Sequence, residues 1–170
     1  MKPSHALFEH LVHSLAAELY NYARLMCRDH HLAEDLVQET FLRAWKSWKD
    51  LRDTRAVKGW MYTILRREYL RCAKRREPFT IDPDAIDIAG IATHDTSTEA
   101  FVLRRAAAGL KPDHLEPLLL QVIAGFDTKE MANILKTTLG AVTTRLHRAR
   151  RQLRAVLSGN QEMTKIERRS

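Results

Sequence analysis

A change of composition divides this sequence into two parts. Residues 77–103 contain no Lys or Arg but six acidic residues, whereas all 28 basic residues of the chain lie on either side. Two Pro, one Gly and a Thr-His-Asp-Thr-Ser-Thr tract in the same segment disfavour a regular core. The sequence therefore predicts a first domain over residues 1–76, an acidic linker over 77–98, a second domain over 99–157 and a polar tail over 158–170. The linker either balances charge or occupies a groove where nucleic acid would otherwise lie.

Apolar residues recur at the helical period in both domains, and no run alternates with a period of two. In the first domain, this pattern predicts helices over residues 5–27, 33–45 and about 54–74. In the second domain, it predicts helices over residues 111–125, 128–135 and 139–157. The expected fold is all-α, with a three-to-four-helix bundle followed by a helix-turn-helix domain.

The second domain carries the local signals of a helix-turn-helix. Asp127 and Glu130 have the spacing of a capping box, in which each side chain accepts a backbone N–H from the other residue. A polar turn over residues 136–138 follows, and Thr138 can cap the long helix. A short helix, a tight turn and a long helix are typical of proteins that place the second helix in the major groove.

The long helix carries five Arg and no acidic residue between positions 139 and 157. Its apolar stripe should face the domain and consists of Val142, Leu146, Ala149, Leu153 and Val156. Arg reads guanine edges in the major groove, and Thr contacts bases or phosphates. The expected contacts to duplex DNA are Thr138, Thr143, Thr144, Arg145, His147, Arg148 and Arg151. The alternative is a basic face that meets only solvent.

A second cationic cluster, interleaved with aromatic residues, lies in the third predicted helix of the first domain. Cations that follow a phosphate backbone and rings that stack on unpaired bases are what single-stranded nucleic acid binding requires. The candidate residues are Trp60, Tyr62, Thr63, Arg66, Arg67, Arg71, Lys74 and Arg75. Trp60 is equally compatible with a place in the core.

The helix over residues 33–45 has an acidic, amide-bearing face that is out of character for a chain of net charge +7. This face either meets only solvent or binds a basic partner. Its predicted apolar stripe consists of Ala33, Leu36, Val37, Phe41, Ala44 and Trp45. The remaining positions include Glu34, Asp35, Gln38, Glu39 and Arg43.

Composition and motifs exclude several other classes of protein. The net charge favours polyanionic partners, nucleic acid before an anionic membrane surface. Cys27 and Cys72 lack CxxC spacing, which favours reduced thiols over a disulfide framework. With no phosphate-binding glycine loop, HExxH motif or zinc-type Cys/His spacing, we expect no enzyme activity, cofactor or metal. The absence of a membrane-length apolar run and of a signal-peptide pattern favours the cytoplasm.

Taken in order, these features resemble the bacterial extracytoplasmic-function sigma factors, the two-domain promoter-specificity subunits of RNA polymerase. Residues 33–45 are similar to the family's polymerase-clamp-binding helix, and residues 59–66 to the segment that melts and reads the −10 element. Residues 118–120, the capping-box helix and residues 142–150 are similar to the −35-binding domain. The resemblance covers roughly residues 8–157.

This resemblance implies a role and a partner for each cluster. The implied contacts to core RNA polymerase are Asp35, Leu36, Gln38, Glu39, Phe41, Arg43 and Trp45. The cationic cluster of the third helix would handle the opened −10 strand, and the linker would follow the polymerase's active-site and RNA-exit path. The implied partners are the β′ clamp and β flap of the polymerase, promoter DNA and an anti-sigma factor, which could tether the protein indirectly to a membrane.

Three positions depart from the family pattern and leave the promoter sequence open. Many members carry Asn where this chain has Arg67, Gly where it has Lys136, and Arg where it has Gln121. Lys136 is expected either to adopt a strained positive φ or to change the turn. Two other functions also stay open: a stand-alone helix-turn-helix regulator that binds DNA as a dimer, and a sigma-like decoy that sequesters an anti-sigma factor.

Overall fold

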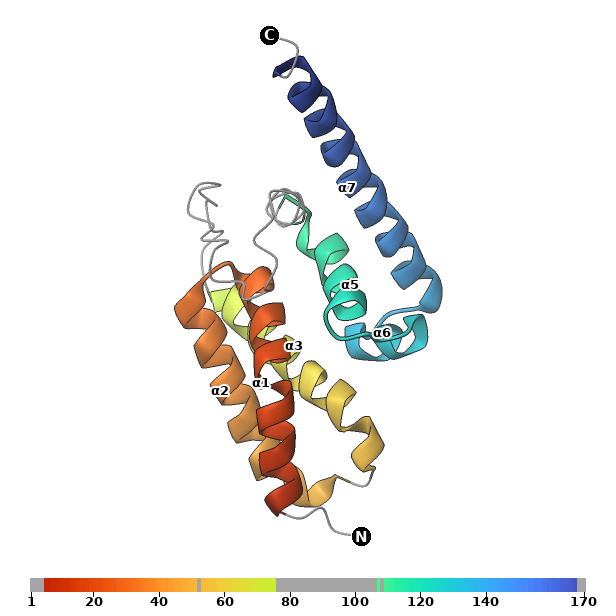
Figure 1. Ribbon diagram of the computed structural model, residues 1–170. Helices are drawn as coiled ribbons and strands as arrows, with labels where there is room; N and C mark the ends of the chain where they lie inside the picture. Colours follow the sequence, from red (N-terminus) through yellow and green to blue (C-terminus); the bar gives the residue numbers. More distant parts are fainter. Residues whose placement is uncertain (1–4, 52, 76–106, 108, 168–170) are drawn as a thin grey trace. The chain divides into compact units, whose positions relative to one another are not determined.

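The computed structural model describes residues 5–51, 53–75, 107 and 109–167. The described residues form α-helices and two short 3-10 helices and contain no strand, which confirms the predicted all-α class. The chain divides into two compact units (Figure 1). The predicted linker over residues 77–98 lies outside the described residues, as does the predicted start of the second domain at Glu99.

The first unit is a bundle of three helices, α1 (His5–Cys27), α2 (His30–Lys46) and α3 (Val57–Arg75), with η1 (Trp48–Asp50) and η2 (Thr54–Ala56) between the last two (Figure 1). Leu19, Met61 and Leu65 are fully buried between these helices. Each such side chain stabilises the fold by roughly 1.5–3 kcal/mol relative to an exposed one. The bundle therefore rests on apolar side chains of the kind whose helical period predicted α1 and α3.

Helix α2 differs from its prediction at its start and in its buried stripe. It begins at His30 rather than Ala33, because Asp29 Oδ1 accepts a hydrogen bond from the Leu32 N–H at 3.0 Å and caps the first turn. Thr40 is fully buried, whereas Phe41 is half-buried and Trp45 is 43% exposed. The Thr40 hydroxyl tolerates burial because it donates to the Leu36 carbonyl at 2.6 Å.

A buried carboxylate joins α2 to α3. Glu68 of α3 is only 4% exposed, and its Oε1 lies 2.9 Å from Arg43 Nε of α2. The same Arg43 nitrogen lies 2.7 Å from Glu39 Oε1, and Arg71 approaches the other Glu68 oxygen from the next turn of α3. These four residues form an ionic network that orients the outer faces of α2 and α3 relative to each other.

The second unit contains α5 (Pro112–Val122) and α7 (Leu139–Glu167), with the short helix α6 (Thr128–Leu135) between them in the chain (Figure 1). The predicted capping box is confirmed. The Glu130 N–H donates to Asp127 Oδ1 at 2.8 Å, and the Asp127 N–H donates to Glu130 Oε2 at 2.9 Å. These two hydrogen bonds satisfy backbone N–H groups at the start of the predicted helix-turn-helix that would otherwise lack partners.

Helix α7 is longer than predicted. The sequence placed its end near Leu157 and a polar tail beyond, but the helix continues to Glu167. Gly159 alone does not end it, because a glycine inside a helix costs only about 1 kcal/mol and no proline follows. The prediction mistook a loss of apolar periodicity for the end of the helix.

The turn between α6 and α7 places Lys136 in the left-handed region, with φ at 52°. The Thr137 N–H donates to the Ala132 carbonyl at 3.0 Å, which is the six-to-one bond of a Schellman motif. The position after the helix end is usually glycine, because a side chain there crowds the backbone. Of the two expectations for Lys136, the first is therefore confirmed: the Schellman turn is formed, and Lys136 has a strained positive φ.

Replacing Lys136 with Gly should stabilise the helix-turn-helix by about 0.5–1 kcal/mol, because relief of the left-handed strain outweighs the added freedom of the unfolded chain. The matched control is Lys129→Gly, an exposed position inside α6, where the same change should destabilise by about 1 kcal/mol. Urea denaturation combined with amide hydrogen exchange of α6 measures both changes. A destabilised Lys136→Gly variant would contradict the strain.

Replacing Arg43 with Ala should destabilise the first unit by about 1–3 kcal/mol, because the buried Glu68 loses one of its two cationic partners. We expect the lower part of this range, since the Arg43 side chain is 44% exposed. Tryptophan fluorescence during urea denaturation reports on this unit alone, as Trp45, Trp48 and Trp60 all belong to it. Arg55→Ala, which breaks an exposed pair with Asp53, should leave the midpoint unchanged. Equal effects of the two variants would remove the special role of Glu68.

Candidate binding surfaces

The first half of α7 has one covered side and one open side, as predicted. Val142, Leu146 and Ala149 are buried. Further along, Leu153 is half-buried and Val156 is 47% exposed, and Figure 1 shows α7 continuing past the N-terminal end of α5. The exposed side chains are Thr143, Thr144, His147, Arg148, Arg150, Arg151 and Arg154. This half of α7 therefore presents a cationic face with no acidic residue.

Not every predicted duplex contact on α7 has its polar group directed outward. Thr138 Oγ1 accepts the Ala141 N–H at 3.2 Å and caps the helix, as predicted. Thr143 Oγ1 donates to the Leu139 carbonyl at 3.0 Å, so its hydroxyl proton is engaged by the helix itself. Arg145 is half-buried. The polar groups most available to a duplex are those of Thr144, His147, Arg148 and Arg151.

Side-chain hydrogen bonds hold α5 against α7. Arg150 Nη2 donates to Gln121 Oε1, and His114 Nδ1 lies 3.1 Å from Gln152 Oε1. Gln121 is one of the positions where the chain departs from the family pattern. An amide there accepts a bond from Arg150, which a guanidinium could not do because it has no acceptor atom.

The exposed cations of α3 share one side of the helix. Arg67, Arg71, Lys74 and Arg75 are exposed and follow one another at intervals of four, three and one residues. Arg66 is half-buried. The last turn of a helix favours cations because the backbone dipole is negative there. Arg71 is partly neutralised by Glu68, so Arg67, Lys74 and Arg75 are the stronger anion-binding candidates.

Tyr62 is not available for base stacking, contrary to the sequence-based expectation. It is fully buried, its ring centroid lies 5.2 Å from that of Tyr22, and its hydroxyl donates to Glu18 Oε1 at 2.9 Å. Burial, followed by the negative charge of Glu18, raises the pKa of the Tyr62 phenol well above its usual value. The ring faces the core because position 62 lies beside Met61 and Leu65 on the buried side of α3.

Trp60 and Thr63 take intermediate positions on α3. Trp60 is half-buried, with its ring centroid 6.5 Å from that of the buried Trp48. The Thr63 hydroxyl donates to the Gly59 carbonyl at 2.8 Å, and its side chain is half-buried. Trp60 therefore contributes to the core while part of its ring stays accessible.

The acidic face of α2 is only partly free. Asp35 and Gln38 are exposed, but Glu39 and Arg43 are tied to each other and to α3. Leu36 is 3% exposed, so it supports the helix from within and cannot touch a partner in this conformation. The structure also exposes Leu42 by 54%, a residue that the sequence analysis did not select. The sequence contained a signal for this contact, because Leu42 is an apolar residue that lies outside the predicted apolar stripe of α2.

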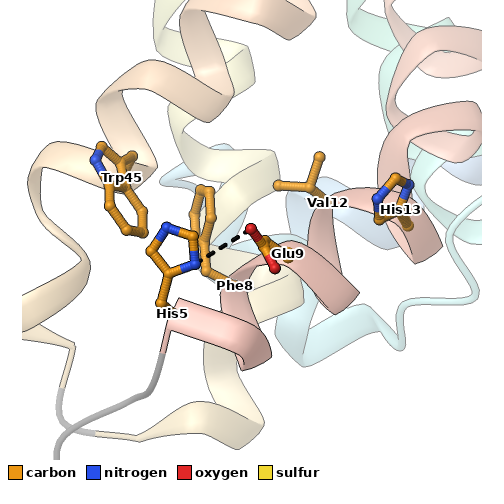
Figure 2. Close-up of a pocket in the computed structure, with 6 residues that line it drawn as sticks. All are labelled: His5, Phe8, Glu9, Val12, His13 and Trp45. Atoms are coloured by element: carbon orange, nitrogen blue, oxygen red, sulfur yellow. Dashed lines mark ion pairs between the residues drawn. The ribbon is translucent and has the colours of Figure 1, made fainter.

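Trp45 forms one wall of a shallow groove of about 260 Å³ at the start of α1, lined also by His5, Phe8, Glu9, Val12 and His13 (Figure 2). The Trp45 ring centroid lies 4.7 Å from that of His5 and 5.0 Å from that of Phe8. His5 Nδ1 lies 3.2 Å from Glu9 Oε1. The ring is thus packed on its inner side and exposed on its outer side.

Known families match both units. The Sigma-70 region 2 family model matches residues 11–78, and the Sigma-70, region 4 family model matches residues 100–153. The ECF RNA polymerase sigma factor SigL of Mycobacterium tuberculosis is 31% identical over 159 residues, which cover 89% of this chain and 89% of SigL. SigE of Mycolicibacterium smegmatis is 28% identical over 92% of this chain, which spans only 64% of the length of SigE.

Two solved structures share the fold. The sigma factor RpoE of Bartonella quintana, crystallised with the anti-sigma factor NepR, has a TM-score of 0.71 at 26% identity and covers 89% of this chain and 96% of its own. CnrH, solved with the cytosolic domain of CnrY, has a TM-score of 0.67 at 23% identity, covering 92% and 90% of the two chains. Because SigL is 31% identical over 89% of both chains, and the two Sigma-70 family models together match most of the sequence, the chain belongs to the extracytoplasmic-function (ECF) family of RNA polymerase sigma factors.

Proposed function

We propose that this protein binds core RNA polymerase and directs transcription initiation to specific promoters. The observation that carries the proposal is the uncovered cationic face of α7, presented by a capped helix-turn-helix. The same chain also has an exposed acidic and apolar face on α2, which a DNA-binding regulator that acts without polymerase would not need. A decoy, conversely, would not need the Arg residues of α7.

In this proposal, α7 lies in the major groove of the −35 duplex. Thr144, His147 and Arg148 reach base edges, and Arg151 contacts a phosphate. The exposed cations of α3 bind the opened −10 strand through its phosphates, and the accessible part of Trp60 stacks on a base. Neither surface alone binds strongly, and the covalent tether between them raises the effective concentration of the second contact.

The polymerase contact uses the outer side of α2. Asp35 and Gln38 meet a basic surface of the β′ clamp, and Leu42 and Trp45 add exposed apolar area next to these polar groups. The second domain contacts the β flap. Glu39 acts indirectly, by holding Arg43 in the network with Glu68.

An anti-sigma factor is proposed as the regulator, acting in the cytoplasm by masking the α2 surface. RpoE of B. quintana was solved with such a partner, which supports this part of the proposal. Along the described residues, no helix is long and apolar enough to cross a membrane. The role is that of a non-enzymatic initiation factor.

Run-off transcription with purified core polymerase over a library of genomic promoters tests the main proposal. Specific start sites that depend on this chain support it. Duplex binding as a dimer without polymerase would indicate a stand-alone regulator. Binding of an anti-sigma factor without any transcript would indicate a decoy.

Replacing Asp35 and Gln38 with Lys should weaken binding to core polymerase at least tenfold, because two cations would then face a basic surface. Glu39 is left in place because its carboxylate holds Arg43. Affinity for immobilised core polymerase is the measurement, and circular dichroism checks the fold. Asp113→Lys, the same charge reversal as at Asp35 but at an exposed site in the second unit, should bind like the unaltered chain. Unchanged binding of the double variant would contradict the α2 assignment.

Replacing Arg148 with Ala should reduce discrimination between the −35 sequence and scrambled duplex by about 1–3 kcal/mol. Arg154→Ala removes the same charge farther along α7, and should weaken specific and scrambled duplex by similar factors. Titrations of the holoenzyme at two salt concentrations separate the two effects. An Arg148→Ala variant that weakens specific and scrambled duplex by similar factors, as Arg154→Ala should, would show that Arg148 acts only through its charge.

A further inference from the structure

The first two turns of α7 present an apolar surface within a face that is otherwise cationic. Leu139, the first residue of the helix, is 52% exposed. An exposed leucine costs little by itself, but this one lies at the end of the helix that a helix-turn-helix protein directs toward base edges. It was not among the residues that the sequence analysis selected.

Thr143 extends this apolar surface. It lies one turn after Leu139 on the same side of the helix. Its hydroxyl donates to the Leu139 carbonyl at 3.0 Å. The hydroxyl is therefore turned along the helix, and the methyl group is the part of this exposed side chain that remains for outward contact.

Gly140 leaves the surface open beside these two residues. It is exposed, it does not have a positive φ, and a Cβ atom at this position would meet nothing within 4 Å. Neither the backbone conformation nor the packing of this chain therefore requires glycine. A glycine inside a helix costs about 1 kcal/mol relative to Ala, and a close approach of another molecule is a common reason to keep one.

We infer that Leu139 and the Thr143 methyl group contact a thymine methyl group in the −35 duplex, with Gly140 permitting the close approach. This inference rests on the proposed function and adds a specificity determinant to it. The thymine C5-methyl is the apolar group that base edges offer in the major groove, and apolar side chains read it. Charge complementarity favours duplex DNA as the occupant, since Arg148 and Arg151 are exposed farther along the same helix.

Different parts of α7 would therefore recognise different bases. Apolar contact in the first two turns selects a T·A pair, and Arg148 in the following turns selects guanine by donating to its acceptor edge. Leu139 is thus a specificity-determining residue, whereas the more distant Arg154 supplies general attraction for phosphates.

The test selects upstream duplexes from a randomised library with the full chain assembled on core polymerase. The selection is run twice, once with thymidine and once with deoxyuridine, which pairs identically but lacks the methyl group. The chain should prefer T·A at one or two positions in the first library. Each preference should fall about fourfold per methyl group in the second, which is the typical value of burying one such group.

Leu139→Ala should lose the thymine preference in the first library while keeping its guanine preference. Val156→Ala is the matched control, because Val156 is an exposed apolar residue of the same helix, 47% exposed, and lies several turns away. It should select the same duplexes as the unaltered chain. Circular dichroism confirms that each variant keeps its helical content.

The inference alone would be overturned by a thymine preference that deoxyuridine leaves unchanged, or by one that Leu139→Ala retains. Enrichment of guanine without any thymine preference would do the same and would leave the proposed function standing. No enrichment of any sequence would overturn both the inference and the proposed function.

Discussion

The buried carboxylate of Glu68 is the interaction on which the arrangement of the first unit depends. A charged oxygen inside a helical bundle costs several kcal/mol unless cations accompany it, and here Arg43 of α2 and Arg71 of α3 do so. Apolar stripes alone would allow α2 to rotate or slide a little against α3. The ion pair restricts that freedom, because only one register places the Arg43 guanidinium beside Glu68. The faces proposed for polymerase and for the opened strand therefore keep a constant orientation to each other.

Local hydrogen bonds of the backbone have the corresponding role in the helix-turn-helix. The capping box of Asp127 and Glu130, the left-handed Lys136 and the Thr138 cap determine where α6 ends and α7 begins. These bonds span at most a few residues, so the geometry of the turn depends little on distant packing. Tertiary bonds such as that of Arg150 to Gln121 then set α7 against α5. The result is a helix whose first turns are free for a ligand although its middle is anchored.

Features that depend on neighbouring residues were predictable from the sequence. The capping box, the Thr138 cap and the bounds of α6 agree with prediction because each follows from side chains three or four positions apart. The open side of α7 agrees as well, since its period is regular. The same reasoning failed at Thr40, whose internal hydrogen bond satisfies a hydroxyl that hydrophobicity alone places outside. It also failed at Tyr62, because an aromatic ring beside cations has the same pattern whether it stacks on bases or packs on Tyr22.

The sequence by itself determined the helical class, the position of the capped turn, the two cationic clusters and the family. Periodicity, capping residues and the order of motifs can be read from neighbouring residues, without knowing which distant residues pack against them. Only the tertiary structure decided which members of each cluster stay accessible. It buried Leu36 and Tyr62, engaged Arg43 and Arg71 with Glu68, and exposed Leu42 and Leu139. Accessibility depends on which helices pack against a given face. Because this packing brings together residues that are far apart in the sequence, a local sequence pattern cannot predict it.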